Sequence, residues 1–353
     1  MESMSSESVQ YTNDEATATK AYAVRLGYWS DPYIKLFCPI PSSSTPEISR
    51  GYYVRVQTFE AVVIRFIQEC NQVCQVVNLG AGSDTLFFRL KDKDLLPKAY
   101  IELDLPGNVR KKIFTLQRNK ALQAALPTGD SGFLPSTAPK DRISFGCYHL
   151  LSFDLKAPPA SLISLLCDSP DGPSLSPGLP TLFLAECVLV YIPTEFSSSL
   201  LSTLSDKFTQ AAFLNYEQVN MQDKFGEIMQ SHFRDRSCEL PGLAACGSLE
   251  EQKSRFINNG WTEVHAWTIN EVFSSFPQGA ISRYSFLAFT SIPIHNFNTF
   301  RHAFEPSRIS QLEMLDDTEI TQQLYDHYCI VLATNTGAIC HWNSLKMALS
   351  DLK

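Results

Sequence analysis

The stretch Val76-Val77-Asn78-Leu79-Gly80-Ala81-Gly82-Ser83-Asp84-Thr85 decides how the chain is interpreted. A short apolar run leads into a Gly-x-Gly turn, and the residues from Thr85 to Leu90 can open a helix. Glycines at positions 80 and 82 let the backbone turn sharply and let a ligand approach the main chain closely. The unpaired N–H groups at the start of the following helix point to the same place. This strand–turn–helix pattern predicts a nucleoside-binding loop.

The next apolar stretch, Tyr100 to Leu105, carries the acidic residues Glu102 and Asp104. Asp104 follows Gly82 by about 20 residues, the spacing at which an acid at the end of a second strand meets the ribose hydroxyls of a bound nucleoside. We therefore expect Asp104 to face the same ligand as the glycine turn.

Segments with strand character alternate with segments of helical spacing along the chain, which predicts a parallel α/β sheet with helices on both faces. Residues 1–16 are polar and acidic, which predicts a disordered tail. Residues 17–337 form one predicted domain, and 338–353 a variable C-terminal tail. The strands are expected at 74–79, 99–104, 142–145, 148–155, 181–190, 211–216, 261–267 and 329–334.

Composition excludes several classes of protein. The chain has 353 residues and 44% hydrophobic residues, which is typical of a globular protein that buries a core. Its net charge of −8 is unfavourable for binding nucleic acid. No apolar run approaches the roughly 18 residues of a membrane span. The ten cysteines contain no C-x-x-C pair, so they are interpreted as reduced thiols of a cytoplasmic protein, and no metal site is predicted.

Glu186 lies inside the apolar run 181–190, where an unpaired carboxylate is costly. It therefore requires a partner, a ligand, or a place where the strand opens at a cleft. The glycine turn, Asp104, Asp154 and Glu186 would all lie at or just beyond the carboxyl ends of neighbouring strands. Ligands of open α/β sheets bind at that edge.

The residue at position 85 distinguishes between nucleoside ligands. A dinucleotide loop reads G-x-G-x-x-G, but position 85 is threonine, and no phosphate-binding G-x-x-x-x-G-K-[ST] motif is present. S-adenosylmethionine carries no phosphate, so a shorter loop suffices, with Asp104 at the ribose and Asp154-Leu155 at the adenine. An NAD-dependent oxidoreductase remains the alternative.

Longer motifs along most of the chain resemble the leucine carboxyl methyltransferase family, whose members methyl-esterify the C-terminal leucine of the type 2A protein phosphatase catalytic subunit. The motifs are Gly27-Tyr28-Trp29-Ser30-Asp31-Pro32-Tyr33, Pro46-Glu47-Ile48-Ser49-Arg50-Gly51-Tyr52, Val77 to Thr85, Ala185-Glu186-Cys187-Val188-Leu189-Val190-Tyr191, Asn215-Tyr216-Glu217-Gln218-Val219-Asn220-Met221 and Ser307 to Cys329.

The resemblance implies a class I S-adenosylmethionine-dependent methyltransferase of α/β, Rossmann-like architecture. It implies a seven-stranded, mostly parallel sheet with an added lid and substrate subdomain, a helical lid at 17–72, and inserts near 127–141, 157–180 and 281–306. The product would be S-adenosylhomocysteine. The cofactor-binding residues implied are Lys20, Arg55, Gly80, Gly82, Asp104, Asp154, Leu155 and Glu186.

The implied reaction moves a methyl group from a sulfonium to a carboxylate that is already ionised at neutral pH, so no general base is expected. Arg55 and Tyr191 are expected to act by orientation, and Tyr191, Tyr216 and Gln218 to bind the substrate. The expected partner is the phosphatase catalytic subunit, and the expected state is a monomer. A catalytically inactive phosphatase-binding module with the same fold is the second alternative.

The chain departs from the family pattern between Phe276 and Ser307. The motif Ile281-Ser282-Arg283-Tyr284 competes with Ser307-Arg308-Ile309-Ser310 for the same match, and about 20 residues separate them. This segment is either a real insert or a gene-model artefact that retains an intron.

Overall fold

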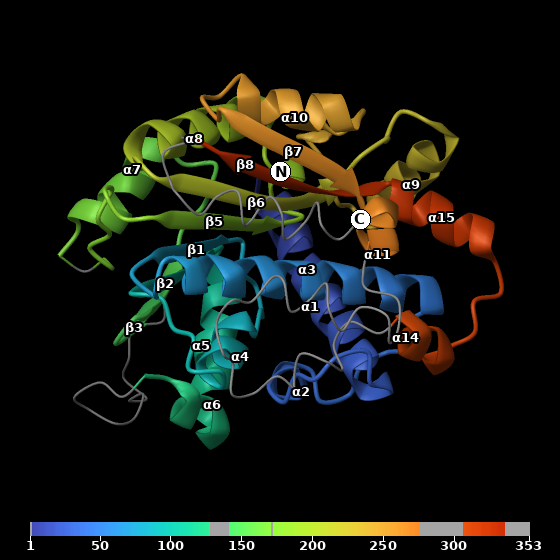
Figure 1. Ribbon diagram of the computed structural model, residues 1–353, viewed down its shortest axis with the longest axis horizontal. Coiled ribbons are helices and arrows are strands. Elements are labelled where there is room, and N and C mark those ends of the chain that lie inside the picture. The colour runs from blue at the N-terminus through green and yellow to red at the C-terminus, as the bar shows by residue number, and fades with distance from the viewer. Residues whose placement is uncertain (1, 128–140, 171, 276–305, 336–353) are drawn as a thin grey trace.

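A single eight-stranded sheet forms the centre of the protein, in the strand order β3-β4-β2-β1-β5-β6-β8-β7 (Figure 1). The computed structural model describes residues 2–127, 141–170, 172–275 and 306–335. The strands are β1 (Gln75–Leu79), β2 (Ala99–Asp104), β3 (Arg142–Phe145), β4 (Tyr148–Ser152), β5 (Thr181–Glu186), β6 (Ala211–Gln218), β7 (Glu263–Thr268) and β8 (Tyr328–Thr334).

The five strands β4, β2, β1, β5 and β6 are parallel, which confirms the predicted α/β class. β8 is antiparallel to β6 and to β7. The sheet has eight strands rather than seven because β3 adds an antiparallel edge strand beside β4. Gly146, with φ of +53°, lets the chain reverse between them in a two-residue turn.

Two layers of helices cover the sheet because alternate strand residues point to opposite faces. Val76, Leu184 and similar residues pack under α3 (Pro46–Glu69), α4 (Leu86–Lys91) and α5 (Pro106–Arg118). Val77, Phe183 and similar residues pack under α7 (Pro159–Ile163), α8 (Thr194–Lys207) and α10 (Leu249–Ile257). Both faces of the strands are buried, which explains their continuous apolar sequences.

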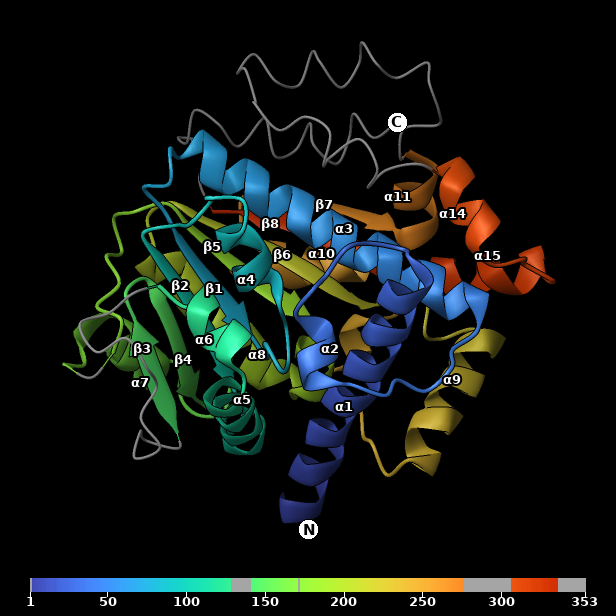
Figure 2. The ribbon, with the colours of Figure 1, turned by 90° about the horizontal axis from the view of Figure 1, so that it is seen from below.

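The predicted disordered tail at 1–16 is wrong, since α1 runs from Glu2 to Leu26. Asp14 pairs with Lys111 of α5 at 2.8 Å, and Glu15 pairs with Arg236 at 2.9 Å. Figure 2 shows α1 between α5 and α9 (Lys224–Asp235), below α3. The polar residues of this segment find partners that lie far away in sequence, so local composition could not reveal its order.

Several element boundaries also differ from the prediction. The expected strand 181–190 ends at Glu186 and is followed by a 3-10 turn at Leu189–Tyr191. Within the expected helical lid at 17–72, α3 starts at Pro46, after a short α2 (Ile34–Phe37). The helical segment after β2 breaks at Asn119, whose backbone is extended, so that α5 and α6 (Lys120–Ala125) are separate helices.

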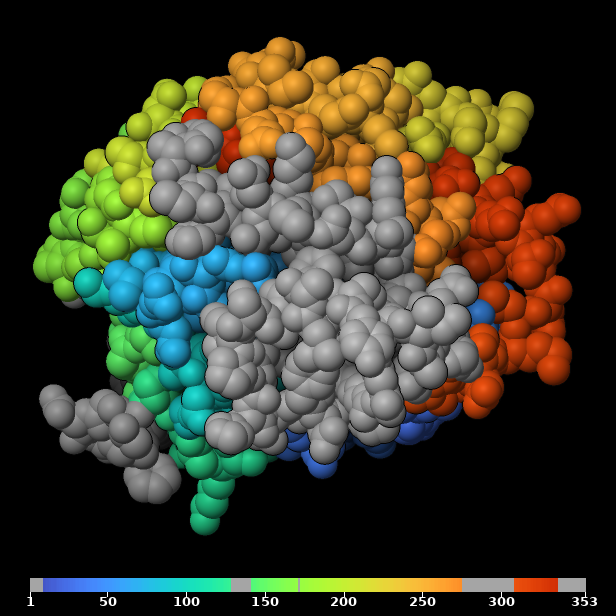
Figure 3. All heavy atoms as spheres, in the orientation of Figure 1, coloured from blue at the N-terminus to red at the C-terminus, as the bar shows by residue number. Residues whose placement is uncertain are grey.

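Three further helices belong to the described part of the chain. α11 (Ile269–Ser275) follows β7, and α15 (Thr318–Asp326) precedes β8. α14 (Pro306–Leu312) lies against α3, where Arg50 Nη2 donates to the Ser310 carbonyl oxygen at 3.5 Å. Figure 3 shows α3 in blue, residues 249–275 in orange and α15 in red on one face of the molecule. Most of the expected inserts at 127–141 and 281–306, and the tail at 338–353, lie outside the described residues. Within the described part of the chain, no helix is long and apolar enough to cross a membrane.

Candidate active site

A cavity of about 910 Å³ opens at the carboxyl ends of the parallel strands. The strand register explains its position, because Leu79 is level with Leu103 and Ala185, and Glu186 with Tyr216. Every residue that the sequence nominated lines this one cavity: Lys20, Arg55, Gly80, Gly82, Asp104, Asp154, Leu155, Glu186, Tyr191, Tyr216 and Gln218. Their individual roles stay predictions.

Both glycines of the turn are required by backbone geometry and by space. Gly80 has φ of +67° and Gly82 has φ of +52°, a region that side chains with a Cβ rarely adopt. A Cβ at Gly80 would lie 2.5 Å from Cγ2 of Val188, and one at Gly82 would collide with Oδ1 of Asn13. The turn therefore packs between the strand-end loop and α1, with its backbone at the cavity wall.

Asp104 accepts three hydrogen bonds, one of which comes from the glycine turn. Its Oδ2 accepts from the Gly82 N–H at 2.6 Å, and its Oδ1 accepts from the Leu105 N–H at 2.6 Å and from Asn108 Nδ2 at 2.9 Å. Burial raises the pKa of this carboxyl, although these hydrogen bonds act to lower it. An ionised carboxylate has about four acceptor positions, so Asp104 retains capacity for a hydroxyl of a ligand.

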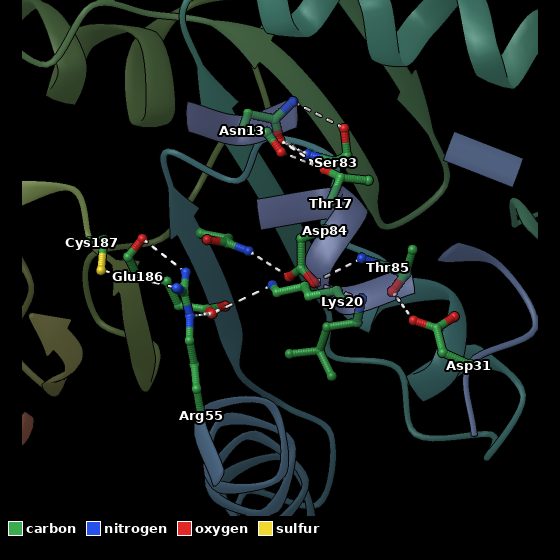
Figure 4. Close-up of polar contacts among 12 residues, drawn as sticks. Asn13, Thr17, Lys20, Asp31, Arg55, Ser83, Asp84, Thr85, Glu186 and Cys187 are labelled. Atoms are coloured by element: carbon green, nitrogen blue, oxygen red, sulfur yellow. Dashed lines mark hydrogen bonds and ion pairs between the residues drawn. The ribbon is translucent and has the colours of Figure 1, made fainter. Parts of the chain in front are cut away.

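Two cations from different helices meet at Glu186 (Figure 4). Arg55 of α3 places Nε 2.5 Å from Glu186 Oε2 and Nη2 3.2 Å from the Glu186 carbonyl oxygen. Lys20 of α1 places Nζ 3.6 Å from the same Oε2. The carboxylate predicted to need a partner has two, and it lies at the strand end where the cavity begins.

The electrostatics keep Glu186 ionised. Burial alone would raise its pKa, but Lys20 and Arg55 outweigh that effect and lower the pKa to about 2. The neighbouring Cys187 has a left-handed backbone with φ of +54°, and burial raises the pKa of its thiol to about 12. A thiol with such a pKa is protonated at neutral pH, so Cys187 is a poor nucleophile.

Aromatic rings form the other end of the cavity. Tyr216 and Tyr328 stack with centroids 5.3 Å apart and an interplanar angle of 9°. The guanidinium carbon of Arg55 lies 4.7 Å from the Tyr216 centroid and 5.3 Å from that of Tyr52, within cation–π range. Arg55 therefore stands at the boundary between the polar glycine-turn end and this aromatic end.

Comparisons with known proteins show which family the chain belongs to. A family model for leucine carboxyl methyltransferase matches residues 8–205. Leucine carboxyl methyltransferase 1 of Rattus norvegicus is 37% identical over 336 residues, which cover 94% of this chain and 91% of the relative. The chain belongs to the leucine carboxyl methyltransferase family. The Arabidopsis thaliana homolog of the same protein is 31% identical, with 93% of this chain and 89% of the relative covered.

Other similarities are broader. The tRNA wybutosine-synthesizing protein 4 of Homo sapiens is 30% identical over 94% of this chain, but the match covers 45% of that protein. Among solved structures, a duf574 family protein from Streptomyces avermitilis has a TM-score of 0.49 and 11% identity, with 90% of this chain and 97% of that chain covered. A score at this level carries no argument about function.

As a member of this family, the protein is an S-adenosylmethionine-dependent methyltransferase that acts on a carboxyl group. The polar end of its cavity fits the cofactor, because it offers an open glycine backbone, a buried acceptor in Asp104 and the cations Lys20 and Arg55. Asp154 and Leu155 lie at the same end. Asp154 is exposed and accepts from the Lys156 N–H at 2.9 Å, whereas Leu155 is buried.

Several residues that line the cavity were not predicted from the sequence. Asn13 accepts a hydrogen bond from the Ser83 N–H at 2.8 Å, but it lies in the supposed tail and had no local signal. Asp84 accepts from Asn78 Nδ2 at 2.9 Å and from the Thr85 N–H at 2.7 Å, and its place directly after the glycine turn could have marked it. Tyr328 stands in a recognised motif, although nothing in its spacing indicated the cavity.

Proposed function

We propose that this protein methylates the α-carboxylate of the C-terminal leucine of the type 2A protein phosphatase catalytic subunit. The observation that carries the proposal is the position of Arg55 between the two ends of one cavity. A donor at the glycine-turn end and a carboxylate at the aromatic end would meet beside its guanidinium. Family membership supplies the reaction class, and the phosphatase as substrate is our inference.

The assigned roles follow from the donors and acceptors present. Lys20 and Arg55 would hold the carboxylate of the cofactor's amino-acid part, beside the backbone of Gly80. Asp104 would accept from the ribose, and Asp154 with Leu155 would hold the adenine. Glu186 fixes the two cations, so it sets where both carboxylates can bind.

Substrate contacts are assigned to the aromatic end. Oε1 of Gln218 is a buried acceptor without a hydrogen-bond partner in the described part of the chain, so it suits an N–H of the substrate backbone. Tyr191 and Tyr216 line the same region and offer hydroxyl donors. Rings at this end provide apolar surface for a leucine side chain.

Catalysis would rest on alignment. When bound, S-adenosylmethionine supplies a methyl group on a sulfonium, and its transfer to an oxygen moves no proton. The protein's residues therefore need only orient the ionised carboxylate and exclude water, and orientation of this kind is worth about 7–11 kcal/mol in well-aligned cases. Arg55 and Tyr191 are the orienting residues that we assign.

The proposal is tested by incubating the full chain with labelled S-adenosylmethionine and the phosphatase catalytic subunit, with and without its last leucine. We expect label on the intact subunit, released by mild base as an ester is. Label that persists after removal of the leucine would refute the substrate assignment. Parallel titrations with S-adenosylmethionine and NAD separate the enzyme from an oxidoreductase, and a phosphatase complex that forms without label would indicate an inactive binding module.

A further inference from the structure

Arg255 is a buried cation on the face of the sheet opposite the cavity. It belongs to α10, and 6% of its surface is exposed. On β6, Glu217 points toward the α10 face, whereas its neighbours Tyr216 and Gln218 line the cavity on the other side. Arg255 therefore contacts β6 from the face of the sheet opposite the cavity, and it is not part of the cavity wall.

Its guanidinium joins three segments. Nη1 donates to Glu217 Oε2 at 3.3 Å, and Nη2 donates to the Leu189 carbonyl oxygen at 3.0 Å and to Ser197 Oγ at 2.9 Å. Leu189 opens the 3-10 turn that ends at Tyr191. One side chain thus connects β6, the Leu189–Tyr191 turn and the first turns of α8.

The chain is strained two residues before the turn that Arg255 holds. Cys187 adopts a left-handed backbone, and its N–H donates to the Tyr216 carbonyl oxygen at 2.7 Å. A non-glycine residue in that region costs of the order of 1–3 kcal/mol and persists only where surrounding contacts hold it. The Arg255 contact at Leu189 is such a restraint, two residues further along the chain.

We propose that Arg255 is a positioning residue for the carboxylate substrate, because it sets Tyr191 relative to Tyr216 and Gln218 from the opposite face of the sheet. The inference rests on the proposed function for the identity of the substrate. It assigns Arg255 no contact with substrate or cofactor. The glycine turn and Asp104 lie on other strands, so cofactor binding should not depend on it.

A merely structural role makes a different prediction. Buried ion pairs can often be replaced by uncharged residues of similar volume without loss of stability, whereas removal of one partner alone is strongly destabilising. If Arg255 serves only to neutralise Glu217, then Arg255→Met with Glu217→Gln should restore activity together with stability. If it positions the Leu189–Tyr191 turn, the double variant should be stable but still impaired.

The experiment compares Arg255→Met, the double variant, Arg255→Lys and the matched control Lys253→Met, a cation on the same helix that pairs with Glu250. We expect the double variant to recover most of the Tm that Arg255→Met alone loses and to keep the wild-type Kd for S-adenosylmethionine. Its kcat/KM for the phosphatase subunit should fall about 10- to 100-fold, as displacements near 1 Å can cause. Arg255→Lys should lose less kcat/KM than the double variant does. Lys253→Met should have the kcat/KM of the wild type. Wild-type kcat/KM in the double variant, or an equal loss of cofactor affinity, overturns the proposal.

Amide hydrogen exchange supplies a readout that needs no substrate. In the double variant the amides of Tyr191 and Ile192 should exchange faster, while those of residues 81–84 stay unchanged. Unchanged exchange at Tyr191 and Ile192 overturns the positioning role. If the wild type does not methylate the phosphatase, the proposed function fails, and the exchange result still decides the role of Arg255.

Discussion

Nε of Arg55 lies 2.5 Å from Oε2 of Glu186, and this contact joins α3 to the end of β5. Glu186 also pairs with Lys20 of α1 at 3.6 Å, so one mostly buried carboxylate contacts two helices over the carboxyl edge of the sheet. The charge cluster places the Arg55 guanidinium against Tyr216. The polar and the aromatic ends of the cavity are therefore joined by this cluster of Glu186, Arg55 and Lys20.

Replacement of Arg55 by alanine should abolish most methyl transfer. The change removes the group between the two ends of the cavity and leaves Glu186 with Lys20 as its cation. We expect kcat/KM to fall at least about 100-fold, the size of effect that misplaced reactants produce. Arg65→Ala is the matched control, since Arg65 lies on the same helix, pairs with Glu69 and is not part of the cavity wall. Turnover near that of the wild type in Arg55→Ala would contradict the orienting role assigned to Arg55.

Asp104→Asn should weaken binding of S-adenosylmethionine. The amide would place an N–H donor where the carboxylate now accepts from Gly82 and where a ribose hydroxyl would donate. We expect Kd from calorimetry to rise about tenfold or more, which corresponds to roughly 1.4 kcal/mol. Asp168→Asn, a change at an exposed residue outside the cavity wall, should bind as the wild type does. Equal Kd values for both variants would show that Asp104 does not bind the ribose.

The N-terminal helix should contribute to cofactor binding. Asn13→Ala removes the acceptor of the Ser83 N–H, and a hydrogen bond of this kind is worth about 1 kcal/mol, or roughly a fivefold change in Kd. Deletion of residues 2–16 also removes the Asp14 and Glu15 ion pairs, so its effect should be larger. Tyr11→Ala serves as the control, because Tyr11 is 61% exposed. A deletion that leaves affinity and Tm unchanged would show that α1 does not support the site.

Glu217 should make the stability fall as pH rises from about 4.5 to about 7. Burial raises its pKa to about 7, despite the opposing effect of Arg255, from an ordinary value of 4.5. Between these values the folded protein binds more protons than the unfolded chain, so the contribution of Glu217 to stability declines as pH increases and is lost above the folded pKa. Glu217→Gln does not titrate and provides the reference.

Urea unfolding of the wild type and Glu217→Gln, from about pH 5 to about pH 8, measures this effect. The unfolding free energy of the wild type should decrease relative to that of the variant by up to roughly 3 kcal/mol across the range. Glu186 contributes in the opposite direction and at lower pH, because its folded pKa is about 2. The stability that Glu186 provides is lost only as pH falls from about 4.5 through that value. A difference between the two proteins that is independent of pH would contradict the Glu217 assignment.

Much of the site could be predicted because parallel strands end at one edge. The continuous apolar runs at β1 and β5 located the strands, and Gly80 and Gly82, with their positive φ values, form the sharp turn that the sequence predicted. Asp104 and Glu186 lie near the glycine turn because β2 and β5 are parallel to β1 and flank it in the sheet. The sequence predicted the parallel direction, whereas the strand order comes from the structure.

The sequence by itself determined the α/β class, the glycine turn and the strand-end acids, because these depend on local periodicity and backbone conformation. Only the tertiary structure decided which partners those groups have. Glu186 meets a cation 131 positions away in the chain, and Asn13 meets Ser83 across 70 positions. The ion pairs of α1 and the hydrogen bond from Arg255 to the Leu189 carbonyl oxygen likewise join residues far apart in the chain. Such contacts depend on how helices pack on the sheet, and the free energy of that packing is shared among residues that no local pattern connects.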